Sequence, residues 1–132
     1  MTNAKIEASF PYSLQKVWDT VTSLHDISWR SDLGKVQVLS STKFIEYTKR
    51  GYPTTFTVTE MQPYQRWEFD MENQNIKGHW TGIFSYENGE TTICFTEVVV
   101  AKKLFMKPLV KIYLKKQQQT YISDLQKALL AK

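Results

Sequence analysis

The Asn88-Gly89 pair is the feature that most constrains how this chain can fold, because it separates two long runs of β-branched and aromatic residues. A two-residue turn of type I′ needs positive φ at both central positions, and Asn-Gly supplies it readily. We therefore expect a hairpin of antiparallel strands over residues 76–87 and 90–101. The short turn also fixes their register.

In that register Glu87 faces Glu90, and counting back pairs Trp80 with Glu97. One face of the hairpin then carries mostly large apolar side chains: Trp80, Phe84, Ile93 and Phe95, together with Glu97. The other face collects His79 and small polar residues, with Ile83 as its main apolar exception. The first face is therefore expected to be buried.

Short runs of β-branched and aromatic residues, separated by turn residues, extend from Gly34 to Lys102 and predict an antiparallel meander. The remaining strands are expected at residues 35–40, 43–49, 54–61 and 65–72. If the turns at residues 50–53 and 62–65 each hold four residues, the inward positions align in two sets. Ile45 and Tyr47 would face Val58 and Phe56, and Glu60, Val58 and Phe56 would face Trp67, Phe69 and Met71. One concave, aromatic face results.

Residues 4–10 alternate in polarity and predict another half-buried strand. Ser13 can cap an amphipathic helix from Leu14 to about Leu24. A second short helical turn is expected over residues 26–31, with Ile27 and Trp29 pointing inward.

Residues 104–132 predict a long C-terminal helix, in which Pro108 fits only within the first turn or at a kink. Its apolar residues fall on two different azimuths, one in each half of the helix: Met106, Leu109, Val110 and Tyr113 in the first half, and Tyr121, Leu125, Ala128 and Leu129 in the second. The two halves should therefore meet different surroundings.

Length and composition predict a single domain over residues 1–132, since 132 residues with 14% aromatic side chains suffice for one large core. No leader-like segment or apolar run of spanning length is visible, so we expect a cytoplasmic protein. The lone Cys94 lacks the spaced Cys and His companions of a zinc site. We expect neither a metal nor a cofactor.

The order of elements, and stretches such as IEASFPYSLQKVWDTVTSL, EMQPYQRWEFD and KPLVKIYLKKQQQTYISDLQKAL, resemble the helix-grip superfamily of START-related lipid-transfer proteins, polyketide cyclases and plant pathogenesis-related allergens. The resemblance covers the whole chain, and the stretches quoted above look like those of bacterial members of the superfamily. It implies an α+β helix-grip fold: a seven-stranded curved antiparallel sheet around a long C-terminal helix, with two short helices between the first two strands. It also implies a ligand cavity between sheet and helix.

We predict that such a cavity binds or transports a hydrophobic small molecule: a lipid, a polyketide or an aromatic compound. The predicted ligand-binding residues are Trp29, Tyr47, Phe56, Val58, Glu60, Trp67, Phe69, Trp80, Phe84, Phe95, Glu97 and Tyr113. The same aromatic side chains also suit an ordinary packed core. A cyclase or dehydratase acting on a polyketide-like substrate, and a regulatory partner protein, remain as alternatives.

Glu60 and Glu97 fall on the predicted apolar face, where an unpaired carboxylate is costly. Either carboxylate would orient a ligand or act as a general base of raised pKa, unless it lies near a strand end and reaches solvent or a lysine. His25 and His79 have no partners at catalytic or metal-binding spacing. The sequence therefore shows no catalytic constellation.

Lys103, Lys107, Lys111 and Lys115 recur every four residues and form a basic stripe on the C-terminal helix. The stripe is typical of a solvated helix face. Alternatively, the apolar residues beside it could dip into a membrane while the lysines meet anionic headgroups. Nucleic acid binding is not expected, because no exposed aromatic platform accompanies the lysines.

Overall fold

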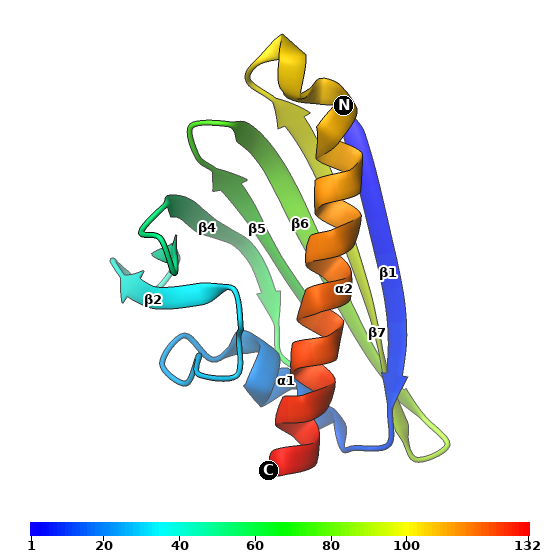
Figure 1. Ribbon diagram of the computed structural model, residues 1–132. Coiled ribbons are helices and arrows are strands. Elements are labelled where there is room, and N and C mark those ends of the chain that lie inside the picture. Colours follow the sequence, from blue (N-terminus) through cyan, green and yellow to red (C-terminus); the bar gives the residue numbers. More distant parts are fainter.

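The computed structural model describes all 132 residues and contains one seven-stranded antiparallel sheet, curved around a long helix (Figure 1). The strands lie in the order β1-β7-β6-β5-β4-β3-β2 across the sheet. Their bounds are β1 (Thr2–Phe10), β2 (Leu33–Val38), β3 (Lys43–Thr48), β4 (Pro53–Gln62), β5 (Arg66–Glu72), β6 (Ile76–Glu87) and β7 (Glu90–Ala101). The helices are α1 (Leu14–Thr22) and α2 (Lys107–Ala131), the latter preceded by a 3-10 turn, η1 (Leu104–Met106).

The hairpin of β6 and β7 has the predicted strand bounds and register. Asn88 and Gly89 both have positive φ, 54° and 79°. Glu87 pairs with Glu90, and Trp80 pairs with Glu97. The side chains on the predicted inner face are buried at Trp80, Phe84, Ile93, Phe95 and Glu97.

The hairpin of β3 and β4 departs from the prediction. Ile45 and Tyr47 do not face Val58 and Phe56; Phe44 pairs with Phe56 instead. The predicted pairing was wrong by three positions. Because side chains alternate between the faces of a strand, a register error of an odd number of residues places each of them on the opposite face. Phe44 is consequently buried on the concave side.

The cause of this difference is where the turn closes. Tyr47 pairs with Pro53 and Thr48 lies opposite Tyr52, so the turn consists of residues 49–51 and not of the four residues 50–53 that were predicted. The Thr48 amide donates to the carbonyl of Tyr52 over 2.9 Å, and Gly51 adopts a φ of 89° that glycine tolerates best.

The pairing of β4 with β5 follows the prediction as far as Val58, which faces Phe69. A bulge between Val58 and Glu60 then shifts the register, so Glu60 faces Glu68 and not Trp67. An extra residue in one strand of an antiparallel pair turns the following side chains. Glu60 is consequently exposed.

Between β1 and β2 the structure has one helix, α1, where two were predicted. Residues 26–31 form only a turn, closed by a 3.0 Å hydrogen bond from the Arg30 amide to the Ile27 carbonyl. The Ser31 amide donates to the carboxylate of Asp124 on α2. A helix would direct this amide to the Ile27 carbonyl, so the tertiary contact replaces the helical bond.

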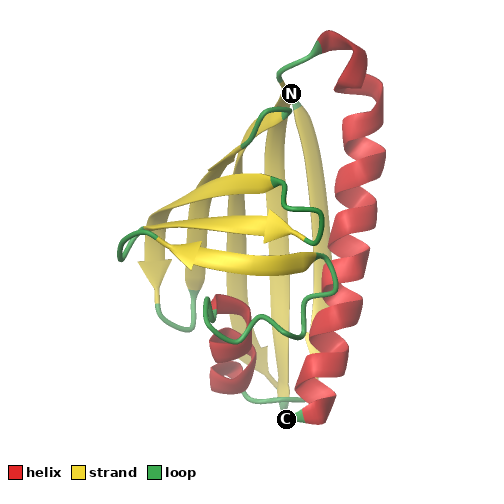
Figure 2. Cartoon of the chain, turned by 60° about the vertical axis from the view of Figure 1, so that its left-hand side comes forward, coloured by secondary structure: helices red, strands yellow, loops and turns green.

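Helix α2 crosses the concave side of the sheet over β1 and β7, with Pro108 in its first turn as predicted (Figures 1 and 2). In its second half Leu125, Ala128 and Leu129 are buried. Of the apolar set predicted for the first half, only Val110 is buried, whereas Leu109 and Tyr113 are mostly exposed. The two halves do meet different surroundings. No helix in the structure combines the length and apolar character needed to cross a membrane.

Candidate ligand-binding pocket

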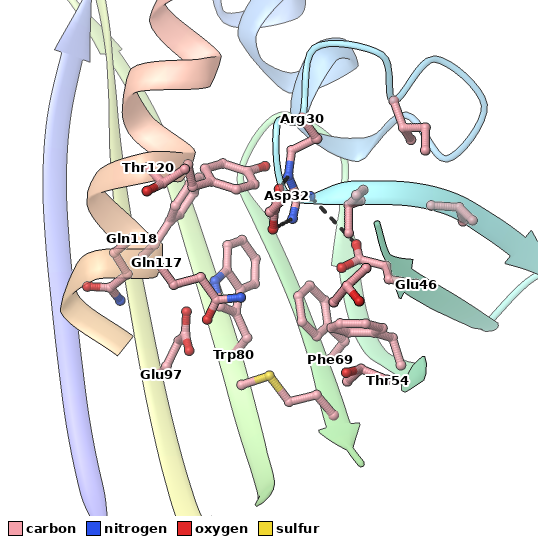
Figure 3. Close-up of a pocket in the computed structure, with 18 of the residues that line it drawn as sticks. Arg30, Asp32, Glu46, Thr54, Phe69, Trp80, Glu97, Gln117, Gln118 and Thr120 are labelled. Carbon is pink, nitrogen blue, oxygen red and sulfur yellow. Dashed lines mark hydrogen bonds and ion pairs between the residues drawn. The ribbon is translucent and has the colours of Figure 1, made fainter. Parts of the chain in front are cut away.

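A pocket of about 310 Å³ lies between the concave face of the sheet, helix α2 and the segment that joins α1 to β2 (Figure 3). Side chains from β2 to β7 line it on the sheet side, and Tyr113 to Tyr121 line it on the helix side. Of the 28 lining residues, 16 are hydrophobic. The pocket lies where α2 leaves the middle of the sheet uncovered, because the helix packs along β1 and β7.

Stacked and edge-on aromatic rings form the floor of the pocket. Phe44 and Phe56 stack with ring centres 5.0 Å apart, and Phe69 stacks on Trp80 at 4.7 Å. Trp67 packs edge-on against both Phe69 and Trp80, at 5.1 and 5.8 Å. Such packing holds rigid apolar walls around the space.

Eight of the twelve residues predicted to bind ligand line this pocket: Trp29, Phe56, Trp67, Phe69, Trp80, Phe95, Glu97 and Tyr113. The other four, Tyr47, Val58, Glu60 and Phe84, do not. Val58 packs against the core, and Phe84 is buried against Trp18 of α1 at a ring distance of 4.8 Å.

Tyr47 and Glu60 lie outside the pocket because of the two register differences described above. The Tyr47 hydroxyl donates to Gln37 over 3.0 Å, and its ring lies beneath the ammonium of Lys35. The Glu60 carboxylate accepts a 3.3 Å hydrogen bond from Gln62. Both residues therefore sit among polar side chains outside the pocket.

Glu97 is a buried carboxyl group on the α2 side of the pocket. Its side chain is 7% exposed and forms no ion pair, so the reading that it reaches solvent or a lysine is wrong. Burial raises the pKa of Glu97 to about 7, and the neighbouring Gln118 amide offsets part of this effect. Gln118 is itself held by a 3.1 Å bond to the carbonyl of Ala4. Near neutral pH this carboxyl group is therefore divided between its protonated and ionised forms.

A second polar group, absent from the predicted site, lies on the opposite wall (Figure 3). The Arg30 guanidinium donates to both oxygens of Asp32 at 3.0 Å, and it lies 3.6 Å from Glu46 on β3. Burial would lower the pKa of Arg30, but Glu46 and Asp32 outweigh it and the net direction is upward. The pKa of Glu46 is raised by burial, against the opposing charge of Arg30.

Helix α2 fixes this charged group in place. The guanidinium of Arg30 lies 4.7 Å from the ring centre of Tyr121, which also packs edge-on against Trp29 at 5.3 Å. The buried carboxylate of Asp124 accepts bonds from the amide and hydroxyl of Ser31, at 2.8 and 2.7 Å. The segment before β2 is thereby tied to the helix and rims the pocket.

The two histidines lie outside the pocket. His79 is on the convex face, where its ring nitrogens contact Asp70 at 2.7 Å and Glu68 at 2.8 Å. His25 is exposed on the connection after α1. No three His, Cys, Asp or Glu side chains gather in a way that could hold a metal ion.

The indole N–H groups of Trp29 and Trp67 are buried without a hydrogen-bond partner. Burying an unpaired donor of this kind costs about 1–3 kcal/mol. Both residues line the pocket.

No protein-family model matches this sequence, and no curated protein matches it. Solved structures do resemble it along almost its full length. A START superfamily protein from Mycobacterium smegmatis is 9% identical, with a TM-score of 0.89 over 98% of this chain and 97% of that one. A conserved protein from Geobacillus kaustophilus is 12% identical, with a TM-score of 0.84 over 98% and 96%.

A third similar structure is DynU16, from the dynemicin biosynthetic locus, which is 13% identical with a TM-score of 0.75. The match covers 96% of this chain and 46% of DynU16. At identities this low, the TM-scores establish a shared fold and no more. The protein therefore has the helix-grip α+β fold of START-like proteins, as its sequence predicted.

Proposed function

We propose that this protein binds or transports a hydrophobic small molecule in the pocket between the sheet and α2. The observation that carries the proposal is the aromatic floor, where Phe44, Phe56, Trp67, Phe69 and Trp80 all line one space. A volume of about 310 Å³ is at the lower end of the range for small-molecule pockets and suits a compact ligand. Each 100 Å² of apolar ligand surface buried there would contribute about 2.5 kcal/mol.

Polar groups at the two walls would orient the ligand. Glu97 and Gln118 lie on one side of the aromatic floor, and Arg30, Asp32 and Glu46 on the other (Figure 3). Arg30 is already paired with both carboxylates, and the remaining cation among the lining residues, Lys116, is exposed to solvent. The interior of the pocket therefore suits hydroxyl or carbonyl groups, and a ligand with a carboxylate would have to place it beside Lys116.

The direct test is native mass spectrometry of protein purified from its own host, followed by organic extraction of any bound compound. A cavity-filling variant, Val36→Trp, adds bulk to a partly buried residue that lines the pocket. It should weaken binding of the extracted compound by tenfold or more. Ile83→Trp, on the convex face, is the matched control and should bind like the unmodified protein.

A compound bound equally well by the Val36→Trp variant would contradict the proposal. So would a protein that carries no small molecule from its host and binds none of a panel of neutral lipids, sterols and aromatic ketones.

A second candidate function is an enzyme of the cyclase or dehydratase type, acting on a polyketide-like substrate. The buried carboxyl of Glu97 favours it, because a pKa of about 7 suits a general acid or base at neutral pH. The similarity to DynU16, from a biosynthetic locus, is compatible with this reading. Here the aromatic floor would hold the reacting chain while Glu97 moved a proton.

The enzymatic candidate can be tested with 5-nitrobenzisoxazole, a small aromatic compound whose ring opens when a base removes one proton. Catalysis should rise with pH around an apparent pKa of about 7 and disappear in Glu97→Gln. Glu60→Gln changes an exposed carboxyl group outside the pocket and should leave the rate unchanged. Equal rates in all three proteins would eliminate Glu97 as the base.

A further inference from the structure

Five large apolar side chains in residues 104–113 are exposed to solvent, although such residues are usually buried. They are Leu104, Phe105, Leu109, Ile112 and Tyr113, with exposed fractions of 79%, 75%, 62%, 69% and 57%. We call this set the apolar patch. It covers η1 and the first turns of α2, which extend past the ends of the strands (Figure 2). Exposed apolar groups that gather in this way mark an interaction surface.

The patch follows the helix geometry. Leu109, Ile112, Tyr113 and Lys116 are spaced as i, i+3, i+4 and i+7, which places them along one side of α2. The inward side is occupied by other residues, including Val110 and Leu114, which are 5% and 1% exposed. The patch is therefore the outer face of a helix whose inner face is already packed.

Positive charge surrounds the patch. Lys102, Lys103, Lys107, Lys111, Lys115 and Lys116 are all exposed, and no acidic residue occurs from 102 to 116. Only Lys102 has an ion-pair partner, Glu72, at 2.7 Å. Five ammonium groups thus remain without a counter-charge in the protein.

We propose that the apolar patch and its lysines dock on the surface of an anionic membrane. Apolar side chains flanked by lysines on the exposed face of a helix suit the boundary between headgroups and acyl chains. The lysines would meet anionic headgroups while Phe105 and Ile112 enter the apolar layer. A second copy of the chain fits less well, because a symmetric contact would bring lysines against lysines.

Docking would also orient the pocket. Tyr113 and Lys116 belong to the outer stripe of α2 and line the pocket as well. A protein lying on a membrane through this stripe would hold the rim of the pocket against the lipid. A hydrophobic ligand could then pass between membrane and pocket without crossing water. This last step rests on the proposed function, whereas docking itself does not.

The test is sedimentation with phosphatidylcholine vesicles, with and without about 30% phosphatidylserine, at low and physiological salt. The protein should bind the anionic vesicles more tightly, and salt should weaken that binding. Each lysine near an anionic surface strengthens partitioning roughly fivefold. Lys107→Glu/Lys111→Glu/Lys115→Glu should therefore lower partitioning at least 100-fold.

The control reverses three other exposed lysines, Lys5→Glu/Lys43→Glu/Lys127→Glu, and changes the net charge equally. It should retain most of the binding. An equal loss in the two triple variants would show attraction to net charge alone and would overturn the proposal. Equal sedimentation of the unmodified protein with neutral and anionic vesicles would overturn it too.

Phe105→Ser/Ile112→Ser tests the apolar contribution without disturbing the core, since both side chains are exposed. We expect at least a tenfold loss of binding to anionic vesicles. Unchanged binding would refute insertion of the patch. A dimer in analytical ultracentrifugation that this variant dissociates, with no vesicle binding by the unmodified protein, would assign the patch to self-association. The pocket-filled Val36→Trp protein should still bind vesicles, which separates this proposal from ligand binding.

Discussion

Replacement of Glu97 by Gln should stabilise the protein at alkaline pH and leave its stability nearly unchanged at acidic pH. The pKa of Glu97 is about 7 in the folded protein, against an ordinary value of 4.5. The folded state therefore holds this proton more tightly than the unfolded chain does. The stabilising contribution of the neutral carboxyl is complete below about pH 4.5 and is lost as the pH rises through about 7.

The size of the effect follows from the two pKa values. Each tenfold difference in proton affinity corresponds to about 1.36 kcal/mol, so keeping the buried carboxyl ionised costs about 3 kcal/mol at pH 8. Gln cannot ionise and avoids this cost. With a denaturant slope of about 2 kcal/mol per molar urea, the unfolding midpoint of Glu97→Gln should exceed that of the unmodified protein by roughly 1.5 M at pH 8.

The assay is urea unfolding from pH 4.5 to 8, comparing the unmodified protein with Glu97→Gln and with Glu60→Gln. The midpoint difference should grow with pH for Glu97→Gln and stay flat for Glu60→Gln, whose carboxyl group is exposed. A difference that did not change with pH, or a Glu97→Gln protein less stable at pH 8, would refute the reasoning. It would mean that Glu97 is solvated or paired with a cation.

Three further changes probe the supports of the pocket and the convex face. Asp124→Ala removes the acceptor of both Ser31 bonds and should lower the free energy of unfolding by about 2–3 kcal/mol, measured in urea. Gly82→Ala adds a methyl group that would overlap the ring of Trp80; it should cost about 1–3 kcal/mol and alter the tryptophan fluorescence. Burial would lower the pKa of His79, but its two carboxylate partners raise it overall, so His79→Ala should destabilise the protein more at pH 5.5 than at pH 9.

The sequence was sufficient to predict the half of the sheet that follows Arg66. A two-residue turn sets the register of β6 and β7, and alternation of apolar and polar residues then assigns each side chain to a face. Of the eight predicted residues that line the pocket, Trp80, Phe95 and Glu97 follow from this register. The prediction succeeded because one local signal, Asn88-Gly89, determines the position of residues up to 12 places away from it.

The other half of the sheet could not be predicted with the same accuracy. The turn containing Gly51 and the bulge before Glu60 have no sequence signal as specific as Asn-Gly, and each changes the register. The first of these errors assigned Tyr47 to the concave face, a side that belongs to Phe44 and Glu46. With Glu46 on the wrong face, its contact with Arg30 could not be foreseen.

The polar groups around the pocket give a physical reason to propose a binding site there and not an imperfect core. One wall contains the partly buried charges of Arg30, Asp32 and Glu46, in a place where well-packed apolar residues would usually serve stability at least as well. The same wall contains the unpaired indole N–H of Trp29, and the opposite wall contains Glu97, whose pKa is raised by burial. A core selected for stability alone would not need these polar groups around one aromatic space. A pocket that binds an otherwise apolar guest could use them to recognise the polar atoms of that guest.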